Sequence, residues 1–196
     1  GKLTDPNSSR KIFMGRAGAI ASPTATAFAW SAIDEGLQIH LSKATPKSTA
    51  DSLGQERLNY LRGKRSLEGT TFRLRNKLLG DIVNSGVVYS GKPATTIRSS
   101  SSREFVKTIN ALNSGAGRTP AVFVGANDGM LHAFEEKTGK STSGKELFAY
   151  IPSWMGPKLS ALADKNYVNN HQSYVDGPPA VAEAMAQTAP GSAALL

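Results

Sequence analysis

Three short apolar runs separated by turn residues dominate the pattern of the chain between residues 118 and 152. The runs cover residues 121–124, 130–134 and 147–151. Asn127, Asp128 and Gly129 separate the first two runs, and residues 137–140 form a second glycine-bearing turn. Short apolar strands joined by such turns are typical of an antiparallel meander, and glycine suits the positive φ that these turns need. The pattern therefore predicts three consecutive antiparallel strands.

Helical periodicity dominates the chain upstream of this meander. Apolar residues recur at helical spacing in residues 31–41, where Asp34 lies near the expected N-terminus and suits the helix dipole. A second helix is predicted over residues 48–62. Ser48 and Asp51 resemble a capping box at its start, and a glycine follows its last periodic residue.

The remaining segments predict shorter elements. They are strands at residues 11–14, 87–90 and 180–185, a strand or a turn of helix at 72–79, a helix at 101–112 with Ser101 and Glu104 as its cap pair, a short helix that Pro157 opens, and a turn at 176–179. The chain is therefore expected to be mainly β, with an α-containing N-terminal segment.

Composition narrows the class of protein. The 196 residues are 39% hydrophobic and 19% charged, which is typical neither of a disordered chain nor of a membrane chain. Because no run of about 18 apolar residues occurs, no transmembrane helix is predicted. The absence of cysteine excludes disulfides, cysteine-based zinc sites and thiol catalysis. The chain starts at Gly1 rather than Met, and we expect it to be a fragment of a longer protein.

The net charge of +8 is concentrated upstream of the meander. Residues 1–118 carry a net charge of +10, whereas residues 119–196 carry −2. The densest part is a basic cluster of seven residues: Arg57, Arg62, Lys64, Arg65, Arg73, Arg75 and Lys77. This cluster could dock an acidic partner such as a protein subunit, a surface polysaccharide or DNA, or it could be a solvated helix and loop. We favour the second interpretation, and without interleaved aromatic residues no nucleic-acid partner is expected.

No residue set in the sequence predicts catalysis or metal binding. His132 lies within an apolar strand and is expected to be packed or hydrogen-bonded, and His40 and His171 have no partner at metal-ligand spacing. Turn chemistry explains Asn127, Asp128 and Asp176 better than metal binding does. The serines at 99–102 fit a loop and a helix cap, and no common catalytic motif occurs. We therefore predict no catalytic, cofactor-binding or metal-ligating residue.

Several stretches of the chain resemble a known family. VFVGANDGMLHAF (residues 122–134) and KELFAYIPS (residues 145–153) are similar to the C-terminal β-propeller of PilC/PilY-type proteins of type IV pili. Residues 10–13, 60–85 and 166–181 resemble the same family in the same order, so the resemblance spans roughly residues 10–185. The chain departs from the family pattern at Glu135, where aspartate is usual, at Lys64, where an acid is common, and at residues 141–144, a small insertion.

The resemblance implies a partial β-propeller and a role in pilus biology. Residues 80–196 would form the first one or two blades, and residues 1–79 would lead into them. Such proteins promote pilus assembly, oppose retraction and act as tip-associated adhesins at the cell surface, pilus tip or outer membrane. The implied partners are pilin or minor pilin subunits and a host or abiotic surface. Some members hold calcium in an aspartate-rich loop, but no such run occurs here, so a calcium site would lie downstream in the full-length parent or be absent.

Two alternative functions stay open at this stage. The meander also resembles the repeat of PQQ-dependent quinoprotein dehydrogenases, since Ala133, Glu135, Thr138 and Gly139 match its motif loosely. However, no tryptophan closes the unit and no cluster of cofactor-binding groups accompanies it. A generic propeller scaffold unrelated to pili is the other alternative. We favour a non-enzymatic pilus protein that acts by binding.

Overall fold

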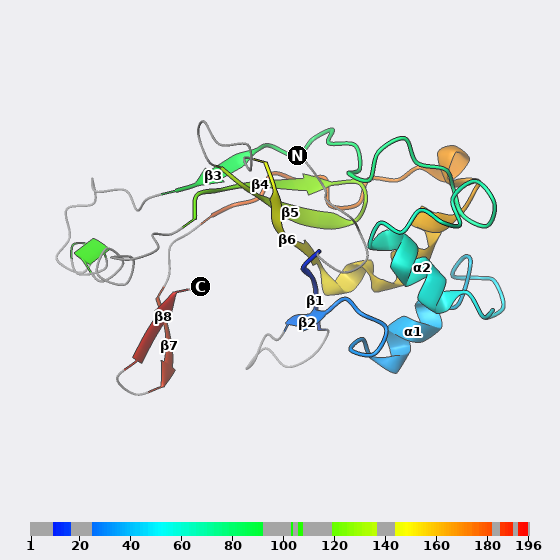
Figure 1. Ribbon diagram of the computed structural model, residues 1–196, viewed down its shortest axis with the longest axis horizontal. Helices are drawn as coiled ribbons and strands as arrows, with labels where there is room; N and C mark the ends of the chain where they lie inside the picture. Colours follow the sequence, from blue (N-terminus) through cyan, green and yellow to red (C-terminus); the bar gives the residue numbers. More distant parts are fainter. Residues whose placement is uncertain are drawn as a thin grey trace.

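The computed structural model describes residues 10–16, 25–91, 103, 106–107, 119–136, 144–181, 185–189 and 192–195. Its main feature is a six-stranded sheet in the order β2-β1-β6-β5-β4-β3 (Figure 1). The strands are β1 (Ile12–Gly15), β2 (Ala25–Ala27), β3 (Val88–Ser90), β4 (Ala121–Ala126), β5 (Met130–Glu135) and β6 (Glu146–Ile151). A separate two-stranded sheet consists of β7 (Met185–Ala189) and β8 (Ser192–Leu195).

Strands β3 to β6 form an antiparallel meander in chain order. Residues 127–129 close the β4–β5 turn, where Gly129 has φ 88°. The three strands predicted at 121–124, 130–134 and 147–151 and the strand predicted at 87–90 are confirmed. Four antiparallel strands in sequential order are the connectivity of one propeller blade.

The N-terminal segment adds a strand to the outer edge of this meander. Strand β1 pairs in parallel with β6, so that Ile12 lies opposite Ala149 and Met14 opposite Ile151. Strand β2 then pairs antiparallel with β1. The strand predicted at 11–14 is confirmed within one residue. Its partner lies more than 130 residues away in the chain, so the edge of β6 is covered by a distant segment.

The two predicted N-terminal helices are present, but the second starts later than expected. Helix α1 (Glu35–Leu41) begins at Asp34, whose Oδ1 accepts a hydrogen bond from the Leu37 N–H at 2.8 Å. Helix α2 (Gly54–Leu61) has no side-chain cap. The capping-box prediction was wrong, because the Ser48 hydroxyl bonds to Thr45 instead and the Asp51 carboxylate binds the Arg57 guanidinium.

Three further predictions differ from the structure. Pro157 does not open a helix but lies within the 3₁₀-helix η1 (Ser153–Ala163), which a shorter one, η2 (Tyr167–Asn170), follows. Residues 72–79 form neither a strand nor a helical turn, because their backbone and side chains bond to η1 and α2 rather than to a neighbouring strand. Of the strand predicted at residues 180–185, only residues 180, 181 and 185 are described, and of these only Met185 lies in a strand, β7.

Some predicted features fall where the structure gives little or no description. Of the helix predicted at residues 101–112, only residues 103, 106 and 107 are described, and these are helical. Its cap pair, Ser101 and Glu104, the serines at 99 and 100, and the turn at 137–140 with Thr138 and Gly139 lie outside the described residues. The division of the chain at residues 79 and 80 stays a prediction.

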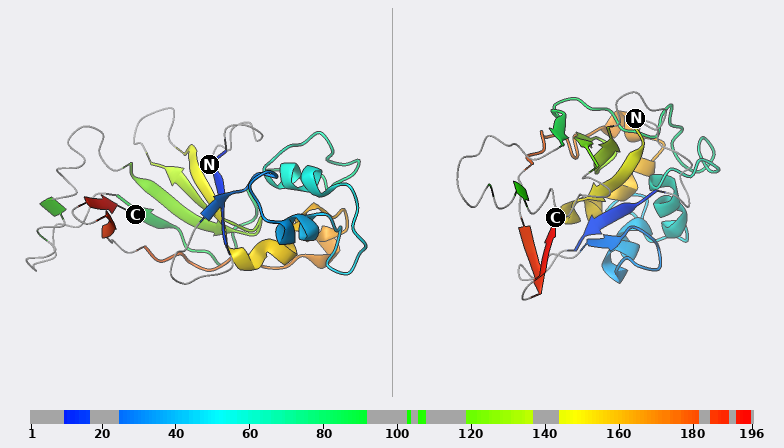
Figure 2. Two further views of the ribbon diagram at one scale, coloured as in Figure 1. Left: turned by 90° about the horizontal axis from the view of Figure 1, so that it is seen from below. Right: turned by 60° about the vertical axis from the view of Figure 1, so that its left-hand side comes forward.

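The hydrophobic core lies where the helices meet one end of the sheet. Figures 1 and 2 show α1, α2 and η1 gathered at the end of the sheet that carries the β4–β5 turn. Met130 and Ile151 contribute from the strands, and the buried Met155 and Leu159 contribute from η1. The fold is thus mainly β with few helices, and the six-stranded sheet is open rather than closed. Within the described part of the chain, no helix is long and apolar enough to cross a membrane.

Candidate functional site

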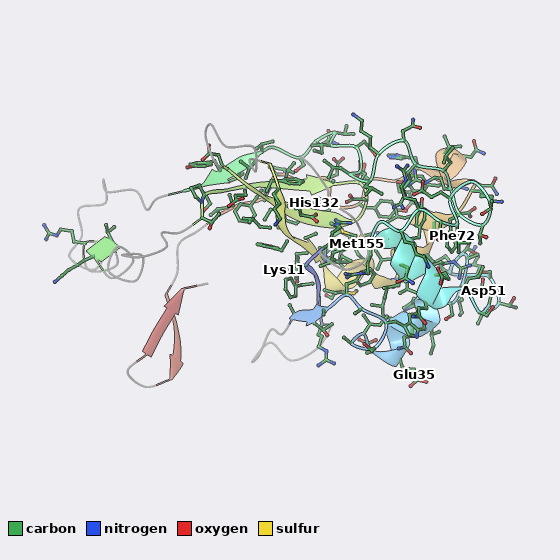
Figure 3. All side chains as sticks on the ribbon, viewed as in Figure 1. Lys11, Glu35, Asp51, Phe72, His132 and Met155 are labelled. Carbon is green, nitrogen blue, oxygen red and sulfur yellow. The ribbon has the colours of Figure 1, made fainter. Side chains whose placement is uncertain are left out.

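A buried chain of charged groups runs through the centre of the molecule (Figure 3 labels His132). The His132 side chain is inaccessible to solvent, and its Nδ1 lies 2.8 Å from Glu146 Oε1. Its Nε2 lies 3.1 Å from both carboxylate oxygens of Asp128. On the other side of Glu146, the Arg10 guanidinium donates two hydrogen bonds to the carboxylate, at 2.6 and 2.8 Å. Arg10 Nη1 also donates to the carbonyl oxygen of Arg62 at 3.0 Å, which ties α2 to the sheet.

This geometry fixes the protonation state of His132. Both ring nitrogens face carboxylate oxygens, so both must carry hydrogen to donate. Burial alone lowers the pKa of His132, but the Asp128 and Glu146 carboxylates outweigh it and raise the pKa from 6.5 to about 9. Burial likewise raises the pKa of Glu146, yet Arg10 and His132 lower it to about 2. The four groups are therefore all ionised near neutral pH, and their charges cancel.

Arg10, Asp128, His132 and Glu146 form what is called here the His132 network. Their mutual pairing occupies the side chains that could otherwise act as catalytic or metal-binding groups. Each ionisable side chain in it is held by a neighbour of opposite charge, which is how proteins accommodate buried charge. Asp128 additionally accepts a hydrogen bond from the Gly80 N–H at 3.0 Å. As expected from the sequence, His132 is packed and hydrogen-bonded. The carboxylates that hold it were not expected, because Glu146 lies on another strand and Asp128 was assigned to the turn alone.

Asn127 and Asp176 also connect distant loops. Asn127 Oδ1 accepts a hydrogen bond from the Tyr174 N–H at 2.9 Å, and its Nδ2 donates to Asp81 Oδ2 at 2.9 Å. The Asp176 carboxylate accepts hydrogen bonds from the backbone and side-chain N–H groups of Asn84, at 2.9 and 2.7 Å. Local turn chemistry thus accounts for only part of the role of these residues, since their side chains fasten loops that lie far away in the chain.

Five members of the basic cluster are engaged in structural contacts. Arg57 pairs with Asp51, Lys64 with Glu56, and both Arg65 and Arg75 with Glu68. Arg62 donates to the carbonyl oxygens of Phe28 and Arg10. The solvated helix and loop favoured from the sequence therefore describe most of the cluster. Among the residues that the structure describes, Arg62, Arg73 and Lys77 have no carboxylate partner, and Arg73, like Arg62, donates to a backbone carbonyl oxygen.

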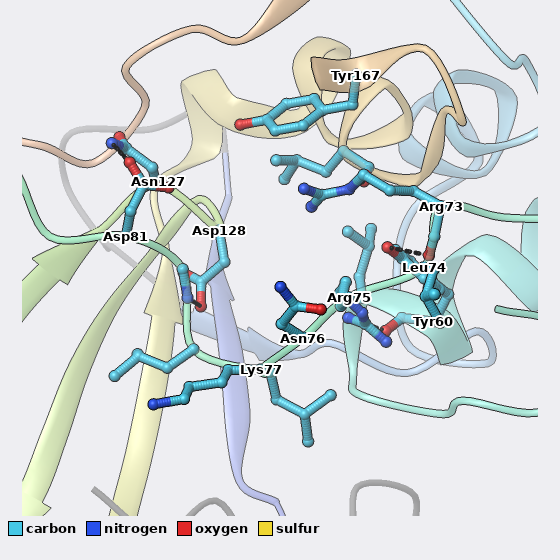
Figure 4. Close-up of a pocket in the computed structure, with 15 residues that line it drawn as sticks. Tyr60, Arg73, Leu74, Arg75, Asn76, Lys77, Asp81, Asn127, Asp128 and Tyr167 are labelled. Atoms are coloured by element: carbon cyan, nitrogen blue, oxygen red, sulfur yellow. Dashed lines mark hydrogen bonds between the residues drawn. The ribbon is translucent and has the colours of Figure 1, made fainter. Parts of the chain in front are cut away.

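Arg73 and Lys77 both line a cavity of about 530 Å³ (Figure 4). The cavity lies between the 73–81 loop, the β4–β5 turn and the two 3₁₀-helices. The Arg73 guanidinium lies 4.1 Å above the ring centre of Tyr167, and its Nε donates to the Leu162 carbonyl oxygen at 3.3 Å. Tyr167 is only 4% exposed, and its hydroxyl has no hydrogen-bond partner in the described structure. This cavity is the candidate binding site. The sequence pattern indicated Arg73 as part of the basic cluster, but nothing in it indicated Tyr167.

The other residues considered from the sequence lie apart from this cavity or at its edge. His40 lies in the last turn of α1. His171 is half-exposed, with its Nε2 3.4 Å from Asp81 Oδ2. Across the described segments, no three histidine, aspartate or glutamate side chains are placed to hold a metal ion together.

The antiparallel four-stranded meander, which lies in an open six-stranded sheet, is the architecture of a propeller-blade domain. A family model described as the PilY1 beta-propeller domain matches residues 79–192, so the chain belongs to this family. The match includes the cavity loop from Leu79 onward, the β4–β5 turn and both 3₁₀-helices.

Curated relatives extend the similarity to the N-terminal segment. A type IV pilus biogenesis factor PilY1 homolog of Xylella fastidiosa is 41% identical over 72% of this chain. The type IV pilus biogenesis factor PilY1 of Pseudomonas aeruginosa strain PAK is 38% identical over 89% of it. The chain spans only 11% and 15% of the lengths of these two relatives. No solved structure was found to match it.

Proposed function

We propose that the chain is a non-enzymatic binding module of a type IV pilus assembly factor and tip-associated adhesin. The observation that carries this proposal is the similarity to relatives named as type IV pilus biogenesis factors, which extends over most of the chain. Its partners would be pilin or minor pilin subunits and a host or abiotic surface. Its place would be the pilus tip or the outer face of the cell.

The arrangement of side chains supports a binding role. The groups of the His132 network hold strands and loops together, because each is paired with a neighbour of opposite charge. The meander then acts as a rigid scaffold, and the loops around the β4–β5 turn are presented at one end. In this proposal residues 80–196 supply the opening blade or blades of a propeller, and residues 1–79 lead into it. Any calcium site belongs to other parts of the parent protein.

Deletion of the parent gene tests the pilus role. We expect the deletion strain to lose surface pili, twitching and attachment, and the intact parent gene to restore them. Complementation with the parent carrying Gly125→Val should fail, because a side chain there meets the Val175 carbonyl oxygen. The matched variant Gly177→Ala, which adds a methyl group in open space, should complement. Normal piliation and attachment in the deletion strain would overturn the proposal.

An enzymatic role is tested separately. The purified parent protein, supplied with PQQ and a redox dye, is expected to show no dye reduction above that of the protein without PQQ. PQQ-dependent reduction would contradict the non-enzymatic assignment and favour the quinoprotein alternative.

A further inference from the structure

The cavity beside Tyr167 contains a buried hydrogen-bond donor that nothing in the described structure uses. The Tyr167 hydroxyl is buried without a partner, which is rare for a buried polar group. The Arg73 guanidinium lies next to the same ring, where its Nε donates to the Leu162 carbonyl oxygen and its side chain also interacts with the Tyr60 hydroxyl, but no described carboxylate pairs with it. Figure 4 shows the Arg73 guanidinium and the Tyr167 side chain on the same side of the cavity. Such a donor is suited to a ligand with acceptor oxygens.

The charges around the cavity favour an anionic ligand. Arg75 is neutralised by Glu68, whereas Arg73 and the exposed Lys77 bring positive charge that no described carboxylate offsets. On the opposite wall, Asp128 is paired with the protonated His132. Asp81 lies at the half-exposed edge, beside His171. The Tyr167 hydroxyl lies within the influence of Arg73 as well as of Asp81 and Asp128, so an incoming carboxylate meets cations only on the Arg73 side, where a guanidinium can bind it through two hydrogen bonds.

The aromatic side chains of the cavity argue against a sugar ring as the ligand. Sugar recognition commonly uses an open aromatic face, but both tyrosine rings here are covered. The Tyr60 ring lies between the Arg75 guanidinium, at 3.6 Å, and Phe72. The Tyr167 ring lies between the Arg73 guanidinium and Tyr174. At the mouth, in contrast, the Leu74 side chain is 68% exposed and offers an apolar contact.

We propose that this cavity binds an acidic side chain in a peptide segment of a partner protein. The carboxylate would accept hydrogen bonds from Arg73 and the Tyr167 hydroxyl, and an adjacent apolar residue of the peptide would pack on Leu74. A volume of about 530 Å³ lies within the usual range for small ligands and accommodates one or two amino-acid side chains. The proposal deepens the binding role proposed above, because it gives the partner a chemistry.

The direct test is a titration of the 196-residue chain followed by NMR. The probe is N-acetyl-Leu-Glu-Leu-amide, and the matched control is N-acetyl-Leu-Gln-Leu-amide, which has nearly the same shape without the charge. We expect saturable shifts of the Arg73 and Tyr167 signals with the glutamate peptide and about tenfold weaker binding of the glutamine peptide, since charge-assisted hydrogen bonds are the stronger ones. Added salt should weaken the binding of the glutamate peptide only.

Two pairs of variants locate the site. Tyr167→Phe removes the unpartnered hydroxyl and should weaken binding of the glutamate peptide severalfold, whereas Tyr174→Phe alters the neighbouring ring outside the cavity and should not. Arg73→Gln should weaken it about tenfold, and Arg65→Gln, whose side chain is 48% exposed and outside the cavity, should not. Unfolding of Tyr167→Phe in urea should match that of the original chain, because the lost hydroxyl bonds to nothing described.

Three results would overturn the proposal. The first is equal binding of the two peptides, or no saturable binding of either. The second is a fall in stability of Tyr167→Phe without a change in peptide binding, which would assign the hydroxyl to an ordered water. The third is binding of glucuronate at Arg73 tighter than that of the glutamate peptide, which would indicate a carbohydrate partner. A failed titration leaves the gene-deletion phenotype untouched, so failure of this site and failure of the pilus role are separately recognisable.

Discussion

The His132 network makes the stability of the fold depend on pH in a way that can be calculated. The pKa of His132 is raised from 6.5 in the unfolded chain to about 9 in the folded one. A raised pKa means that the folded state holds the proton more tightly, so the stabilisation is complete below pH 6.5 and is lost as the pH rises through about 9. A shift of this size corresponds to about 3 kcal/mol of unfolding free energy, because one pKa unit is worth about 1.4 kcal/mol.

The assay is urea unfolding across this pH range, followed by tryptophan fluorescence. Trp30 is a suitable reporter because it packs against the core. We expect the unfolding free energy of the original chain to fall by about 3 kcal/mol from pH 6.5 to above pH 9. His132→Gln should be less stable at low pH and should lose this slope, whereas His171→Gln, at a half-exposed pair, should keep it.

The same slope in His132→Gln as in the original chain would refute the protonated, doubly bonded state of His132. A flat profile in the original chain would refute it equally. On the acid side, the lowered pKa of Glu146 predicts stabilisation that is complete above pH 4.5 and lost as the pH falls to about 2. This second transition provides an internal check, since it belongs to the same network.

Three substitutions probe other parts of the fold, each read as a change in urea unfolding against a matched variant. Arg10→Met leaves the buried Glu146 carboxylate with one partner fewer and should lower the unfolding free energy by about 3–5 kcal/mol. Lys64→Met, at a partly exposed pair, should lower it by less than about 1 kcal/mol. Equal losses would contradict the argument from burial. Gly125→Ala should cost about 1–3 kcal/mol because its methyl group meets the Val175 carbonyl, and Gly177→Ala should be nearly neutral; the reverse order would show the loop packing to be wrong. Gly129→Ala and Gly69→Ala both force a side chain to positive φ, but only at Gly129 does the methyl group also meet Met155 Cε, at 2.9 Å. The loss of unfolding free energy should therefore be larger for Gly129→Ala. Equal losses would rule out that contact.

Local pattern was sufficient to predict the meander. Strand, turn and strand between residues 121 and 134 are encoded by neighbouring residues, and Gly129 has the positive φ expected of it. The prediction of where α2 starts was wrong for an equally local reason. Ser48 and Asp51 each have another hydrogen-bond partner nearby, and the sequence does not show which partner is preferred. The family resemblance rested on short motifs in the meander and on stretches before and after it, and the family match to residues 79–192 confirms it.

Contacts between segments far apart in the chain could not be predicted from the sequence. Strand β1 is only four residues long, and nothing in its composition indicates a parallel partner on β6. The carboxylate that holds both Arg10 and His132 belongs to Glu146, which lies 136 residues after Arg10. The cavity is assembled in the same way, because Arg73 reaches Leu162 across 89 residues. Charge and aromatic residues could be counted from the sequence, but their meeting points depend on the tertiary fold.

The pairing of Arg10 with Glu146 also sets an order of events during synthesis. At about 5–20 residues per second, a ribosome completes Glu146 roughly 7–27 seconds after Arg10. Throughout that interval the arginine and strand β1 lack the partners that bury them. The N-terminal segment therefore cannot reach its final state on its own, and the last strand of the meander completes it.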